Sequence, residues 1–149
     1  VGRWGCGVLP GGRACGRVLL DTAAGVGAPC TAAATGADRA LLVLTPDPGA
    51  LRDGKIVADR LRAGGRPQSA VRLVMNRVTR DSFGKRASVE DLDECIDTVG
   101  AQLIAVIPES VALQQAGAAS TVPPAHDAAV VAGQALAKRL CGQRVPLPF

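Results

Sequence analysis

Four short apolar segments, each followed at once by a polar or turn-forming residue, constrain the fold of this chain more than any other feature. They cover residues 17–20, 40–44, 71–75 and 102–107 and consist mainly of Val, Leu, Ile and Ala. Runs of this length and composition are typical of strands buried on both faces. The segments between them are long enough for the crossovers that parallel strands require. The pattern therefore predicts a three-layer α/β/α fold with a doubly wound, mostly parallel sheet.

Helix signals lie in the connecting segments. Asp47 followed by Pro48 predicts an N-cap and a first-turn proline. The helix that begins there is expected to place Ala50, Val57 and Leu61 on one apolar face.

Two further helices are predicted downstream. Ser88, with Asp91 three residues later, resembles a capping box, and apolar residues continue from there at helical spacing. A last helix is expected from about residue 127 to residue 141, after a loop around residues 121–124.

Composition narrows the class of protein. The core must be aliphatic, because 48% of the 149 residues are hydrophobic and only three are aromatic. Five widely spaced cysteines and a single histidine disfavour a zinc site or a disulfide framework. No secretory signal is visible, so we expect a cytoplasmic protein. We expect an irregular glycine-rich segment over residues 1–16, the folded part over 17–142 and a short tail over 143–149.

Charge is unevenly distributed along the chain. Residues 52–86 contain ten basic and three acidic side chains, whereas residues 87–109 contain six acidic side chains and no basic one. Two solvated faces would explain this pattern. A basic surface that binds DNA or anionic lipid would explain it as well.

Polar residues at the predicted strand ends point to one site, because the carboxyl ends of parallel strands share an edge and form the ligand crevice of such sheets. Asp21, Asn76 and the loop at Pro108 follow three of the strands. Asp21 is suited to hold Mg²⁺ through water, since that ion keeps several waters. Gly25 would let a backbone N–H approach a terminal phosphate.

The residues around these positions resemble the MinD family of P-loop ATPases. The resemblance rests on VLLDTAAGVG at residues 18–27, ADRALLVLTPDPGALRD at 37–53 and VRLVMNRV at 71–78. It extends over about residues 17–147, nearly the whole chain. The family's fold is a P-loop NTPase, of which this sequence would form the C-terminal part.

The resemblance implies roles for individual residues. Asp21 would be the Walker B aspartate on the Mg²⁺ side, and Gly25 the switch glycine near the γ-phosphate. Asn76 would hydrogen-bond the adenine of ATP, within the family's Asn-Arg motif that includes Arg77.

The resemblance also assigns a base loop and a partner surface. Pro108 and Glu109 would supply backbone and packing around the adenine. Arg52 and Asp53 would lie near the surface where the family dimerises and meets its regulators.

The sequence departs from the family pattern at two single positions and in one whole motif. Ala23 stands where the family usually has Pro, and Ser110 where it has a second acidic residue. The P-loop G-x-x-x-x-G-K-[ST] is also absent, because the two Gly-Lys pairs are followed by Ile56 and Arg86. We therefore expect a fragment that does not hydrolyse ATP by itself.

The parent protein is expected to be an ATP-dependent dimerisation switch for division-site placement or partitioning, with ATP and Mg²⁺ as cofactors. Its expected partners are a second copy, a regulatory protein, and an anionic membrane or non-specific DNA, so that it is cytoplasmic or peripheral at the inner face of the membrane. One alternative is a degenerate module that binds partners without catalysis. Another is an ATP-dependent ligase of the cobyrinate or dethiobiotin synthetase type, which would need a substrate-binding insert.

Overall fold

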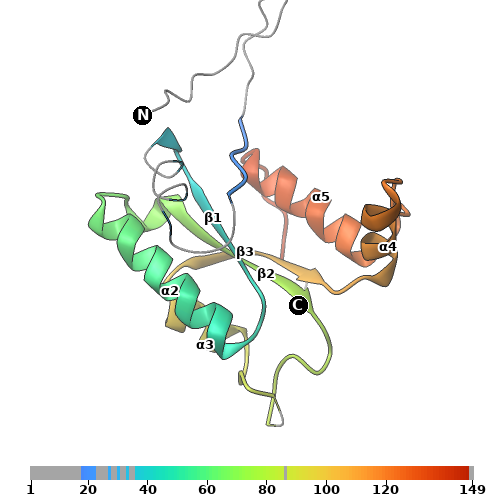
Figure 1. Ribbon diagram of the computed structural model, residues 1–149, viewed down its shortest axis with the longest axis horizontal. Helices are drawn as coiled ribbons and strands as arrows, with labels where there is room; N and C mark the ends of the chain where they lie inside the picture. The colour runs from blue at the N-terminus through green and yellow to red at the C-terminus, as the bar shows by residue number, and fades with distance from the viewer. Residues whose placement is uncertain are drawn as a thin grey trace, which may run out of the picture. The chain divides into compact units, whose positions relative to one another are not determined.

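The computed structural model describes residues 18–22, 27, 30, 33, 36–85 and 87–147. The chain divides into two compact units, residues 1–38 and 39–149. The second unit contains a parallel sheet with the strand order β1-β2-β3 (Figure 1). Its strands are β1 (Ala40–Leu44), β2 (Val71–Val78) and β3 (Gln102–Pro108). The predicted α/β class and the parallel sheet are therefore confirmed.

Four α-helices accompany the sheet within the described residues, together with a short 3₁₀ helix at Gln68–Ala70. Figure 1 shows α2 and α3 together on one face of the sheet and α5 on the other, with α4 beside α5. This arrangement gives the three layers that the sequence predicts. The helices are α2 (Pro48–Ala63), α3 (Leu92–Val99), α4 (Val111–Ala119) and α5 (Ala128–Leu140).

The core is centred on β2, the middle strand. Val71, Leu73, Val74 and Met75 are all fully buried. Because successive side chains of a strand point to opposite faces, this run shows that β2 is covered on both sides. The core is aliphatic, as the composition requires.

The N-terminus of α2 is capped as predicted. Asp47 Oδ1 accepts a hydrogen bond from the Ala50 amide at 2.9 Å, and Thr45 Oγ1 donates to Asp47 Oδ2 at 2.5 Å. The Thr45 hydrogen bond and the Ala50 amide hold the pKa of Asp47 below its ordinary value.

The buried face of α2 is not the predicted one. Ala50 and Val57 are only half-buried, whereas Leu61 is buried as expected. The packed face runs along Leu51, Gly54, Ala58 and Leu61, since Gly54 allows α2 to approach the Leu44 side chain closely.

The start of α3 also differs from the prediction. Asp91, not Ser88, is the N-cap and accepts from the Glu94 amide at 2.9 Å. The Glu94 carboxylate in turn accepts from the Glu90 amide at 2.6 Å. The arrangement is similar to the predicted capping box, but it lies three residues later along the chain and Glu94 reaches the amide before the N-cap instead of the N-cap amide itself.

Two predicted strands need correction. Residues 18–20 form no strand, and Leu19 is 87% exposed. β2 continues to Val78 instead of ending at Met75, so Asn76 and Arg77 lie inside a strand. The crossover between the first two predicted strands falls mostly outside the described residues.

Helix α4 was not predicted, whereas α5 was. The bounds of α5 agree with the expected helix, and Asp127 is its N-cap. Arg139 in its last turn donates to the Ile104 carbonyl of β3 at 3.1 Å and to the Val145 carbonyl at 2.9 Å. These bonds attach the start of the predicted tail to the edge strand. No helix in the described part of the chain is long and apolar enough to cross a membrane.

Arg62, one of the basic residues between 52 and 86, belongs to the fold itself. Its Nη2 donates to the carbonyls of Val99 at 3.1 Å and Gly100 at 2.6 Å, and Nη1 donates to Asp59 Oδ1 at 2.7 Å. The side chain thus satisfies orphan carbonyls at the C-terminus of α3 and ties that helix to α2.

Candidate functional site

The second unit brings four of the predicted site residues to one edge of the sheet. Asn76 and Arg77 lie near the carboxyl end of β2, Pro108 is the last residue of β3, and Glu109 follows it. Val78 pairs with Pro108, and the Glu109 amide donates to the Val78 carbonyl at 3.0 Å. The two strand ends are therefore joined by main-chain contacts.

Asn76 is half-buried at this edge. Within the part of the chain that the structure describes, its side-chain amide makes no hydrogen bond. An amide offers both a donor and an acceptor, so a half-buried one without a partner can bind a ligand that presents the complementary pair.

Arg77 adopts a backbone conformation that is rare for a residue with a side chain. Its φ is +57°, and the ladder between β2 and β3 is irregular between Met75 and Val78. Its guanidinium donates to Glu109 Oε1 from Nη2 at 2.9 Å and from Nε at 3.3 Å. This contact lowers the pKa of Glu109. Arg77 and Glu109, both predicted to contact the nucleotide, are bonded to each other.

The loop after β3 is also bonded to α5. Ser110 caps α4 by accepting from the Leu113 amide at 3.0 Å, and its Oγ donates to Asp127 Oδ2 at 2.7 Å. Asp127 Oδ1 accepts from the Ala129 amide at 2.9 Å. The Ser110 hydrogen bond, followed by those from the α5 amides, holds the pKa of Asp127 below its ordinary value.

Sequence reasoning missed this pair of linked caps. Ser110 was noted only as a departure from the family pattern, and Asp127 only as the start of a helix. A serine before the apolar run that begins at Val111 is itself an N-cap signal, and it would have predicted α4.

No family model matches the chain. The septum site-determining protein MinD of Bacillus subtilis is 29% identical over 133 residues, which are 87% of this chain and 48% of that protein. The MinD cell division protein of Aquifex aeolicus superposes with a TM-score of 0.70 at 26% identity, over 78% of this chain and 49% of that one. Over this length the chain is MinD-like. It spans about half the length of the relatives it matches.

Two further solved structures share the MinD-like fold. The MinC:MinD complex of Aquifex aeolicus matches with a TM-score of 0.67 at 26% identity, over 77% of this chain and 47% of that one. MinD of Pyrococcus horikoshii, solved with Mg-ADP, matches with a TM-score of 0.64 at 23% identity, over 80% of this chain and 48% of that one. The second similarity shows the fold alone.

The residues predicted to serve Mg²⁺ and the terminal phosphate, Asp21 and Gly25, lie in the first unit. Asp21 is exposed and lies in neither a helix nor a strand, and Gly25 and Ala23 lie outside the described residues. Across the described ranges, no three His, Cys, Asp or Glu side chains form a group that could hold a metal ion. The roles of Asp21 and Gly25 stay predictions.

The predicted partner surface of the MinD-like chain lies on α2. Arg52 and Asp53 are both exposed in its second turn. Their exposure is compatible with contact to another protein, and their role stays a prediction.

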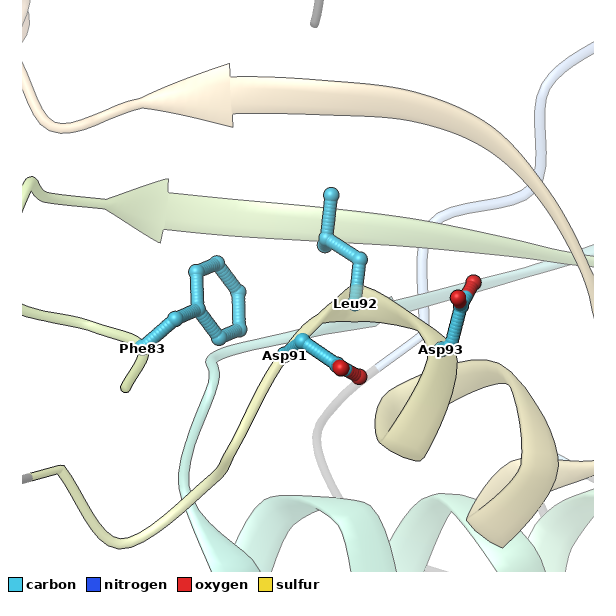
Figure 2. Close-up of a pocket in the computed structure, with 4 residues that line it drawn as sticks. All are labelled: Phe83, Asp91, Leu92 and Asp93. Carbon is cyan, nitrogen blue, oxygen red and sulfur yellow. The ribbon is translucent and has the colours of Figure 1, made fainter. Parts of the chain in front are cut away.

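An open hollow of roughly 440 Å³ lies between the loop that follows β2 and the start of α3. Figure 2 shows the Phe83 ring on one side and Asp91, Leu92 and Asp93 on the other. Its two carboxylates disfavour a phosphate ligand, because like charges repel. We therefore place the nucleotide-binding candidate at the strand ends and not in this hollow.

Proposed function

We propose that this chain supplies the adenine-binding and partner-facing part of an ATP-dependent MinD-type switch in division-site placement. It would act together with a P-loop, which the 149 residues do not contain. The observation that carries the proposal is the half-buried Asn76 amide, which has no partner among the described residues and lies beside a loop fixed to both neighbouring segments.

The residues at the strand ends suit a purine base. Asn76 would pair with the adenine edge through its amide donor and acceptor. Pro108, half-buried at the end of β3, would pack against the ring. Arg77 and Glu109 would act through their contact with each other, which fixes the loop beside the base.

Asp21 and Gly25 would serve the phosphate side. Asp21 would hold Mg²⁺ through water, and Gly25 would present a backbone N–H to the terminal phosphate. The Mg-ADP in the Pyrococcus horikoshii MinD structure supports a magnesium nucleotide as the class of ligand. The chemistry would be transfer of the terminal phosphoryl group to water.

A binding experiment with nucleosides tests the adenine site without requiring a P-loop. Adenosine titrated into the ¹⁵N-labelled chain should shift the Asn76 side-chain amide signals, and guanosine should shift them much less. Asn76→Ala should abolish binding, whereas Gln115→Ala, which removes an exposed amide from α4, should leave it unchanged. Equal binding of adenosine by both variants would contradict the proposal.

ATP hydrolysis by the isolated chain should not exceed background, because the lysine and the backbone amides that cradle phosphates are missing. Supplying a P-loop segment on the same polypeptide should restore Mg²⁺-dependent turnover. Hydrolysis by the chain alone, abolished by Asp21→Ala, would show that the phosphate site is complete without a P-loop.

The partners that we propose are a second copy, a regulatory protein, and an anionic membrane or DNA. The MinC:MinD complex of the Aquifex relative supports a regulatory protein. Exposed Arg52 and Asp53 are the residues to change in a pull-down or dimerisation assay. Charge reversal at either position should weaken association without changing adenosine binding.

For the basic segment over residues 52–86, salt dependence is the deciding measurement. Binding to DNA should weaken steeply with salt, by about 0.9 in log–log slope per neutralised phosphate. Lys85→Gln and Arg52→Gln should flatten the slope. Arg62 is unsuitable for this test, because its guanidinium binds the end of α3.

A second candidate function is a module that binds partners without hydrolysing ATP, with the exposed Arg52 and Asp53 of α2 on its contact surface. Partner binding that persists unchanged in Asn76→Ala and in the absence of nucleotide would favour this module over the switch.

A further inference from the structure

The loop at residues 108–110 is fixed at two successive positions by side chains from distant parts of the chain. Glu109 accepts from Arg77 of β2, and Ser110 donates to Asp127 at the start of α5. Two independent restraints on adjacent residues leave the loop little freedom to rotate. A loop that binds a base needs such a fixed geometry.

The two restraints differ in strength. The Arg77–Glu109 pair is exposed, with 61% and 34% of the two side chains accessible, and ion pairs of this kind contribute little and are screened by salt. The Ser110–Asp127 hydrogen bond is partly buried, 2.7 Å long and directed at an ionised acceptor. Such bonds are shorter and stronger than neutral ones. The Ser110–Asp127 contact is therefore the main restraint on the loop.

The geometry of the Ser110–Asp127 contact also shows which side chain donates the hydrogen bond. Ser110 Oγ accepts from the Leu113 amide, so its proton is directed to Asp127 Oδ2. Asp127 Oδ1 is occupied by the Ala129 amide. Asp127 Oδ1 also accepts from the Val130 amide at 3.4 Å, so both carboxylate oxygens are engaged, and the N-termini of α4 and α5 are joined through the Ser110 and Asp127 side chains.

We infer that Asp127 is a positioning residue of the adenine site, acting through Ser110 to hold the base-binding loop. This inference rests on the proposed function. Position 110 must donate a proton to Asp127 while capping α4, which a hydroxyl does. A carboxylate there would cap α4 equally well but would face the Asp127 carboxylate.

A set of three variants tests the inference. Ser110→Asp keeps the cap of α4 but places two carboxylates against each other. In the double variant S110D/D127N, the amide introduced at position 127 can donate to the new carboxylate while its oxygen still caps α5. Asp47→Ala, which removes the cap of the distant α2, controls for a general loss of stability.

Two measurements on the full chain are needed. Hydrogen exchange of the Glu109 and Leu113 amides reports the order of the loop, and adenosine titration reports its function. We expect S110D to speed exchange at both amides and to weaken adenosine binding by about tenfold, the change expected for one hydrogen bond of this strength. S110D/D127N should restore slow amide exchange and adenosine affinity. Asp47→Ala should change neither the exchange nor the affinity.

The outcomes separate this inference from the proposed function. If the wild-type chain does not bind adenosine, the proposed function is wrong, and the positioning role of Asp127 at that site is rejected as well. If the wild-type chain binds adenosine, the variants decide. Unchanged affinity in S110D, or failure of the double variant to restore it, overturns the positioning role. If Asp47→Ala loses as much adenosine affinity as S110D, the loss comes from lower overall stability, and the positioning role of Asp127 is overturned as well.

Discussion

The two ends of β2 are held in place by different forces. Over Val71–Met75 the strand is buried by apolar side chains on both faces, and this burial supplies free energy without fixing direction. From Asn76 onward it is held by directional contacts, among them the Arg77–Glu109 pair, while the Asn76 amide keeps its donor and acceptor unused. Changes in the first region should therefore act on stability, and changes in the second on binding.

The largest effect should come from the buried end. Leu73→Ala removes a fully buried side chain from the centre of the sheet and should lower the free energy of unfolding by about 3 kcal/mol. Urea denaturation followed by circular dichroism measures it. Asn76→Ala, three residues along the same strand, should cost much less and should lose adenosine binding instead.

Two valines of the sheet show how much burial alone contributes to stability, because their side chains are the same size. Val74 is fully buried, and its register partner Val43 in β1 is 55% exposed. Val74→Ala should destabilise clearly more than Val43→Ala, since the cost scales with the apolar area removed from water. Equal costs would mean that burial does not distinguish the two strands.

The next effect concerns the contact between α2 and β1. A Cβ at Gly54 would lie 2.3 Å from Leu44 Cδ1, so Gly54→Ala must displace the Leu44 side chain and should destabilise by about 1–3 kcal/mol. Gly133 in α5 has open space around it, so Gly133→Ala should stabilise by about 0.5–1 kcal/mol. Thermal melts of the two variants should move in opposite directions; a stabilised Gly54→Ala would show that Leu44 repacks freely.

The sequence predicts most of the sheet because burial is a local pattern. β1 begins and ends where the apolar run does, at Ala40 and Leu44. β2 extends past its apolar run to Val78, because its polar end pairs with β3, which is remote in sequence. Residues 18–20 show that an apolar run is not sufficient by itself, since they form no strand.

The polar contacts of the candidate site could be predicted only in part. The sequence indicates that Asn76 and Pro108 lie at the same edge of the sheet, because crossover connections make the strands parallel. That β2 and β3 are neighbours is shown by the structure. The sequence does not indicate that Ser110 meets Asp127, 17 residues later, since that distance depends on how α4 turns back. Helix α4 itself has no clear apolar stripe and buries only Ala116, so periodicity does not reveal it.

A smaller effect is expected at the cap of α2. Asp47→Ala should lower stability by about 1 kcal/mol at neutral pH. Because the pKa of Asp47 is lowered in the folded protein, its contribution is fully present above the ordinary value of 3.8 and is lost as the pH falls through the folded-state pKa. The stability curves of variant and wild type should therefore converge in acid. Curves that stay parallel down to pH 2 would mean that the carboxylate charge is not what stabilises the cap.

The smallest effect on stability should come from the directional end of β2. Arg77→Gly removes an exposed ion pair, which contributes little, and it also relieves a left-handed backbone conformation that costs a residue with a side chain about 1 kcal/mol. The two changes oppose each other, so the free energy of unfolding should change by no more than about 0.5 kcal/mol.

The Arg77 contact lowers the pKa of Glu109, so that pKa should rise toward its ordinary value in Arg77→Gly. NMR titration of the Glu109 carboxyl carbon measures the rise, and Arg77→Lys, which keeps the charge, should show a smaller one. A loss of stability as large as that of Leu73→Ala would show that the polar end of β2 supports the core, and the division between the two ends would be wrong.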